Sequence, residues 1–224
     1  MQYLRAYEYV FENPKWLKNV LLCTVCAIIP VVGMIVLMGY LCDVFDALRR
    51  REATGYPDFD FGRFGEYLTR GVWVFLVAFV VSLASLPVMG VGMLILFLTM
   101  AAAAQALPIV VACGIAFGAL FFFVIAILLN AVVEPIVIRA ILLRGFTEAF
   151  SWKFIADFAK RMFWQIILVQ LFLMVSAIAW MIFGLLLLCV GVYFVMPVVM
   201  YAQFHLHYQL YEEYLRRGGM EARA

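Results

Sequence analysis

The chain has 224 residues, of which 68% are hydrophobic and 13% charged, whereas an ordinary soluble domain is about half apolar and a quarter charged. This composition excludes a typical soluble domain and predicts an integral membrane protein. The formal net charge of +2 gives no reason to expect a nucleic-acid partner.

The charges are segregated, because three stretches contain no Asp, Glu, Lys or Arg: residues 19–42, 71–133 and 162–211. A helix needs about 20 apolar residues to cross a bilayer, so these stretches fit one, three and two crossings. Backbone groups in a bilayer must be paired, so we expect helices throughout. The prediction is an all-α polytopic membrane helical bundle of about six segments, forming one domain over residues 1–224. The segments are about 16–47, 71–86, 88–104, 109–144, 162–183 and 185–217, with a polar connector at 48–70 and an interfacial helix at 146–161.

The first segment, residues 16–47, carries Pro30 near its centre, followed by Gly33 and by the pair Gly39 and Tyr40. A proline ring removes a backbone donor and clashes with the preceding turn, so the helix is expected to kink or break there. We expect Gly33 to relax the chain after the break and Gly39 to let Tyr40 reach the membrane interface. The segment either spans the membrane as a kinked helix or folds into a re-entrant hairpin.

The basic residues favour the spanning alternative, because Lys and Arg accumulate in short cytoplasmic loops. With a spanning first segment and the N-terminus inside, eleven Lys and Arg residues lie inside and five outside. With a re-entrant first segment, the division is eight and eight. The prediction is a multi-pass protein of the cytoplasmic membrane, with both termini in the cytoplasm.

The connector at residues 48–70 contains the turn-like stretch TGYPD and then Phe59, Phe61 and Phe64 among charged residues. Its aromatic residues predict that it rests on the membrane surface. Pro87 separates the next two predicted helices. The helix at residues 109–144 is long enough to extend beyond the bilayer.

Residues 146–161 have a different pattern, in which phenylalanine recurs every four residues: Phe146, Phe150, Phe154 and Phe158. Charged residues occupy the other faces, which predicts an amphipathic helix lying in the membrane interface. The alternative is a soluble helix packed on a domain core, but we expect no such core in this chain. Two membrane helices follow, with a turn near Gly184 or Gly191.

Three stretches resemble a known family: IPVVGMIVLMGY at 29–40, YPDFDFGRFGEYLTRG at 56–71 and FTEAFSWKFIADF at 146–158. They are similar to the uncharacterised polytopic membrane proteins of bacteria and archaea catalogued as domain of unknown function four-zero-one-three. The resemblance assigns the family signature to Pro30, Gly33, Gly39, Tyr40, Pro57, Phe59 and Gly71. The family has no assigned reaction, so it implies a fold, with a helix break and exit in the first segment, and no chemistry.

Glu134 is an isolated acid deep in the second half of the chain, and Asn130 lies one turn before it on the same helix face. An ionisable group at membrane depth is a candidate functional site. Pro135 and Arg139 mark the membrane interface, where we expect Glu134 to be solvated. The alternative is a proton or cation site.

His205 and His207 have the look of a metal pair, but residues two apart point to different sides of a helix. Cysteine and carboxylate ligands at metal-binding spacing are missing around them. We therefore expect two interfacial histidines and no metal.

Asp43 and Asp46 lie one helical turn apart. Asp46 is placed to form an ion pair with Arg49 or Arg50. Ion pairing is therefore expected here in preference to a cation site.

Two features are expected to serve helix packing. Gly114 and Gly118 form a small-xxx-small pattern, which indicates close contact of helices within or between subunits. The cysteines all lie in or beside apolar runs and are expected to be small packing residues rather than a redox pair: Cys23, Cys26, Cys42, Cys113 and Cys189.

The sequence shows no recognised catalytic motif, so we expect no enzyme activity and no cofactor. The favoured function is an accessory, scaffold or assembly subunit of a membrane complex, in contact with membrane lipids and with partner subunits or further copies of itself. The alternative is a small transporter or channel component that uses broken helices and Glu134. An enzyme acting on lipids is a third, less favoured reading.

Overall fold

The computed structural model describes residues 1–51, 56–103, 108–186 and 190–222. Within these residues every regular element is a helix, which confirms the all-α prediction. The helices are α1 (Arg5–Glu12), α2 (Trp16–Ile28), α3 (Val32–Arg50), the 3-10 turn η1 (Phe61–Arg63), α4 (Phe64–Ala103), α5 (Pro108–Leu143), α6 (Phe146–Ala149), α7 (Trp152–Leu186) and α8 (Val190–Arg216).

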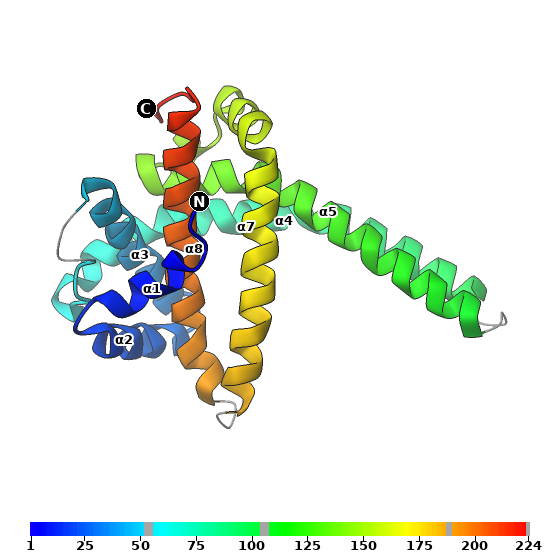
Figure 1. Ribbon diagram of the computed structural model, residues 1–224, viewed down its shortest axis with the longest axis horizontal. Coiled ribbons are helices and arrows are strands. Elements are labelled where there is room, and N and C mark those ends of the chain that lie inside the picture. The colour runs from blue at the N-terminus through cyan, green and yellow to red at the C-terminus, as the bar shows by residue number, and fades with distance from the viewer. Residues whose placement is uncertain (52–55, 104–107, 187–189, 223–224) are drawn as a thin grey trace.

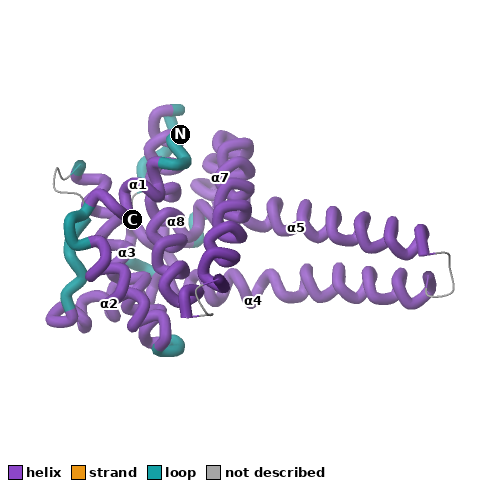
Figure 2. The backbone as a smooth tube through the Cα atoms, turned by 60° about the horizontal axis from the view of Figure 1, so that its bottom comes forward, coloured by secondary structure: helices purple, strands orange, loops and turns teal. Residues whose placement is uncertain are grey.

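Two long helical hairpins and a group of shorter helices make up the structure (Figure 1). α7 and α8 stand side by side, and α1, α2 and α3 pack against α8. α4 and α5 form the second hairpin, which runs across this body and projects far beyond it (Figure 1, Figure 2). Buried side chains gather in the body, so the distal half of the α4–α5 hairpin contacts little of the chain except itself.

Three helical stretches of the described residues are long and apolar enough to cross a membrane: Phe61–Leu98, Val111–Leu143 and Phe146–Leu186. α2 is also apolar, but it is shorter. The predicted division of residues 71–104 into two helices is wrong, because Pro87 lies inside the continuous helix α4. An apolar helix tolerates an internal proline where neighbouring groups satisfy the freed carbonyl. The apolar helices of the structure thus fit a membrane protein, and α4 is longer than the sequence predicted.

The first segment breaks at the predicted place. α2 ends at Ile28, and α3 begins at Val32. Between them, the Val32 amide donates to the Pro30 carbonyl at 2.7 Å, and Val31 has φ 62° and ψ −67°. This is a γ-turn of the strained, positive-φ kind. Proline thus sits in the turn itself, and α2 and α3 pack against each other as separate helices.

Replacing Val31 by glycine is expected to raise the free energy of unfolding by about 1 kcal/mol. A β-branched residue at positive φ stores about 1–3 kcal/mol of strain, which exceeds the entropic cost of a glycine in the unfolded chain. The Val31 side chain is 56% exposed, so little packing is lost. Thermal unfolding in detergent measures the change. Val25→Gly in regular α2 is the control and should lower stability by about 1 kcal/mol; equal losses for the two variants would contradict the prediction.

Part of the connector, which was expected to rest on the membrane surface, is buried in the protein. Tyr56 and Phe59 are 3% and 2% exposed and belong to the core. Two buried asparagine side chains form hydrogen bonds with the backbone of these residues. Asn13 Nδ2 donates to the Tyr56 carbonyl at 2.9 Å, and Asn19 Oδ1 accepts from the Phe59 amide at 3.0 Å. The aromatic residues therefore fill the body beside α1 and α2, a role that their spacing in the sequence does not distinguish from surface binding.

Asp58 also joins the connector to this part of the body, through contacts that are partly exposed to solvent. Lys15 Nζ donates to its carboxylate at 2.6 Å, and Asn19 Nδ2 lies 3.3 Å from the other oxygen. The hydrogen bond from Lys15 lowers the pKa of the Asp58 carboxyl. Because the folded-state pKa is lowered, this attachment is complete above the ordinary aspartate pKa and is lost as pH falls through the lowered value.

The helix predicted at residues 146–161 is not a separate element in the structure. α6 ends at Ala149, and α7 then starts at Trp152 and continues without interruption to Leu186. Phe154 and Phe158 are buried and pack on the ring of Tyr214 in α8, with centroid distances of 5.3 and 4.6 Å. The second half of the apolar stripe therefore faces α8, whereas Phe150 is 39% exposed.

Candidate functional site

Two glycines of the family signature, Gly39 and Gly71, lie where α3 crosses α4, which is the most extensive helix contact among the described residues. A Cβ at Gly39 would overlap the carbonyl oxygen of Tyr67, and one at Gly71 would overlap that of Ile35. At Gly33 it would overlap a carbonyl of the last turn of α2. Only residues without a Cβ allow backbones to approach this closely.

Tyr40 lies at the centre of the same crossing and is fully buried, so its predicted position at the membrane interface is wrong. Its hydroxyl donates to the Pro57 carbonyl at 2.8 Å and accepts from the Tyr201 hydroxyl at 2.7 Å. Its ring contacts Phe59 and Tyr67, with centroids 5.0 and 5.6 Å away. The signature therefore joins the connector to three helices, α3, α4 and α8.

Glu134 is buried between α5, α7 and α8 rather than solvated. One carboxylate oxygen accepts from Gln170 Nε2, and the other lies 2.7 Å from His207 Nε2. The His207 contact has the distance of an ion pair without the alignment of a hydrogen bond, and Nδ1 of this ring has no hydrogen-bond partner in the described part of the chain. Asn130 stays apart, because its side chain donates to the carbonyl of Ala126 in its own helix.

The two histidines are buried within the protein. They do face different sides of α8. His205 lies beside Gln209, with Nδ1 and Nε2 3.0 Å apart, and its ring contacts that of Tyr9, whereas His207 turns to Glu134. Among the described residues, no cluster of His, Cys, Asp and Glu could hold a metal ion.

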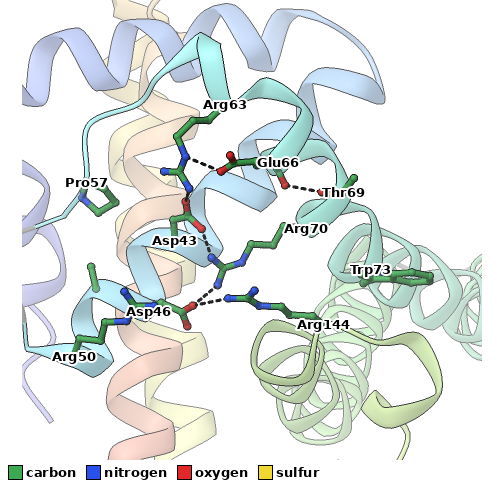
Figure 3. Close-up of a pocket in the computed structure, with 11 residues that line it drawn as sticks. Asp43, Asp46, Arg50, Pro57, Arg63, Glu66, Thr69, Arg70, Trp73 and Arg144 are labelled. Atoms are coloured by element: carbon green, nitrogen blue, oxygen red, sulfur yellow. Dashed lines mark hydrogen bonds and ion pairs between the residues drawn. The ribbon is translucent and has the colours of Figure 1, made fainter.

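A charged cleft of about 550 Å³ opens beside the α3–α4 crossing (Figure 3). Arg70 bridges two carboxylates of α3, contacting Asp43 and lying 2.6 Å from Asp46. Arg63 lies 2.9 Å from Asp43, and Arg144 lies 3.1 Å from Asp46. The residues that line this cleft are Asp43, Asp46, Ala47, Arg50, Pro57, Arg63, Glu66, Thr69, Arg70, Trp73 and Arg144.

Ion pairing at Asp46 was expected with Arg49 or Arg50 in the same helix. The structure pairs this carboxylate with Arg70 of α4 and with Arg144, which directly follows α5. The arginine next to the start of the uncharged run, at position 70, is therefore a cross-link between helices. Sequence spacing alone reports only contacts within one helix.

The small-xxx-small pattern lies within the α4–α5 hairpin. A Cβ at Gly118 would overlap the side chain of Leu96 in α4, whereas one at Gly114 would make only an ordinary contact with Met100. Of the described cysteines, Cys113 is exposed near the hairpin tip. The others, Cys23, Cys26 and Cys42, are buried and free.

The fold is that of an all-α protein with helices that could span a membrane. Its glycines allow α3 and α4 to cross closely, and a charged cleft lies beside this crossing. Residues 22–203 match the family model described as "Protein of unknown function (DUF4013)", and the chain therefore belongs to this family, as the resemblance predicted. No curated protein and no solved structure matches the chain.

Proposed function

We propose that the chain is a non-enzymatic membrane protein that acts as an accessory, scaffold or assembly subunit of a membrane complex. The observation that carries this proposal is the α4–α5 hairpin, which projects from the body (Figure 2). Many of its apolar side chains are exposed. Met93, Phe97 and Phe117 are 69%, 67% and 73% exposed. Such a surface needs lipid or a protein neighbour to cover it.

The hairpin is suited to docking because its two helices already pack against each other. Gly118 packs directly on Leu96, so α4 and α5 contact each other without help from the body. A preformed apolar element loses little conformational entropy on binding, and small residues allow tight helix contacts in a membrane. These features support a structural role in preference to a catalytic one.

Cross-linking through Cys113 tests the proposal. A photoactivatable thiol reagent is attached in membranes to a Cys189→Ser variant, in which Cys113 is the exposed cysteine of the described residues. Illumination is expected to give a discrete protein adduct, either a second copy of the chain or one partner, identified by mass spectrometry. The matched control carries Trp164→Cys and Cys113→Ala, because Trp164 on α7 is 70% exposed but lies outside the hairpin. Lipid adducts alone at Cys113, or the same protein adduct from both positions, would contradict a docking hairpin.

A second candidate, a small proton- or cation-coupled transporter or channel component, is favoured by one observation. Glu134, Gln170 and His207 bring polar groups from three helices together in the apolar interior. Buried ionisable groups of this kind often serve proton relays. In proteoliposomes, Glu134→Gln should abolish a flux of protons or cations while the thermal unfolding midpoint stays within a few degrees. Flux that is absent from the unmodified protein would exclude this candidate.

A further inference from the structure

The charged cleft beside the α3–α4 crossing carries four arginines and three carboxylates, but these differ in how far a ligand could reach them. The side chains of Asp43 and Asp46 are only 12% and 17% exposed, because Arg63, Arg70 and Arg144 cover them. Arg63 and Arg144 are 41% and 56% exposed. A ligand entering the cleft therefore meets guanidinium groups before it meets the two aspartates.

The guanidinium of Arg144 has spare donor capacity. One of its terminal nitrogens forms an ion pair with Asp46 at 3.1 Å, while the planar group carries five N–H donors in a fork that matches phosphate oxygens. Arg50 lines the cleft on the other side of Asp46 (Figure 3). The two arginines thus flank one opening, an arrangement that favours a compact anion with several acceptor oxygens.

An apolar track leads away from this cleft along α4. Trp73 lines the cleft one turn after Arg70, at the start of the uncharged stretch. From there, exposed apolar side chains follow at helical spacing along the helix: Trp73, Leu76, Phe79, Val80, Leu83 and Leu86. A tryptophan between a charged site and an apolar surface occupies the position typical of a membrane–water interface.

We propose that the cleft binds the phosphodiester headgroup of an anionic phospholipid, with its acyl chains lying on the exposed track of α4. Arg144 and Arg50 contact the phosphate oxygens, and Trp73 contacts the glycerol and the upper part of the chains. The combination of a charged cavity and a continuous apolar track distinguishes this ligand from free phosphate, which would use the cavity alone. The site goes beyond the structural role proposed above and does not depend on it.

Thermal unfolding of the delipidated full chain in detergent tests the site. Phosphatidylglycerol is expected to raise the unfolding midpoint, whereas phosphatidylcholine and inorganic phosphate should leave it unchanged. The exposed variant Arg144→Gln should require about tenfold more phosphatidylglycerol for half of the shift, since a charge-assisted hydrogen bond commonly accounts for a factor of this size. Arg216→Gln is the matched control, because Arg216 is 69% exposed and lies outside the cleft.

The three ligands distinguish an anionic phospholipid from free phosphate and from a zwitterionic lipid. An equal shift with inorganic phosphate would overturn the lipid assignment, and an equal shift with phosphatidylcholine would overturn the headgroup assignment. An unchanged lipid requirement in Arg144→Gln, or the same increase in Arg216→Gln, would remove the cleft from the interaction. Trp73→Leu provides an independent measurement and should weaken the response to phosphatidylglycerol; an unaltered response would contradict the track.

Discussion

Gly39→Ala is expected to lower the free energy of unfolding by about 3 kcal/mol, although it adds a single methyl group. The new Cβ would overlap the backbone carbonyl of Tyr67, and a backbone atom cannot rotate away as a side chain can. α3 and α4 would have to separate, which disturbs the buried Tyr40 beside the crossing. Overpacking of a well-packed core costs about 1–3 kcal/mol, and more where backbone must shift. Thermal or denaturant unfolding in detergent measures the loss.

Gly90→Ala is the matched control for this prediction. Gly90 lies in α4, and a Cβ added there meets no atom within 4 Å. The same chemical change in a helix interior with open space should be neutral or stabilise the protein by up to about 1 kcal/mol. A Gly39→Ala variant as stable as Gly90→Ala would show that the close approach of α3 and α4 is not required.

Glu134→Ala is expected to destabilise the protein by about 1–3 kcal/mol, because it removes the partner of the buried His207 and of the half-buried Gln170. Asn130→Ala removes another polar side chain from the same helix, but that side chain bonds only a carbonyl one turn away. The control should therefore lose less than about 1 kcal/mol. Unfolding in detergent compares the two variants directly.

A double-mutant cycle of Glu134→Ala with His207→Ala isolates the pair. We expect a coupling free energy above about 0.5 kcal/mol, since contacting residues in one polar network do not behave additively. Additive losses within error would mean that the 2.7 Å approach of the two side chains contributes nothing to stability.

The sequence was informative about the break at Pro30 and about the helical class, because both follow from local covalent chemistry and composition. A proline ring and long uncharged runs act on the residues beside them. Family membership also followed from contiguous motifs. The physical reason for the signature could not be predicted, since Gly39 and Gly71 are far apart in sequence and meet only where α3 crosses α4.

Predictions from the sequence failed where contacts between distant parts of the chain decide the local structure. Phe154 and Phe158 are spaced for a membrane interface and equally well for a protein core, and in the structure they face α8. Pro87 lies within α4, because its environment and not its chemistry alone decides whether a helix continues. His207 was set aside for its spacing from His205, although its partner was Glu134 on another helix. A search for buried acids and histidines on different predicted helices would have suggested that pair.

The length of α4 has a consequence for the bilayer around the protein. Its uncharged part, residues 71–103, extends about 50 Å at 1.5 Å per residue, well beyond the hydrocarbon thickness of about 30 Å. The helix cannot lie along the bilayer normal with its uncharged part fully covered by acyl chains. It must tilt steeply, bend at Pro87 or locally thicken the lipid, and each of these adjustments costs free energy that increases with the excess length. Long helices can share this cost by clustering, so hydrophobic mismatch gives a physical reason for such a helix to associate with others in a bilayer.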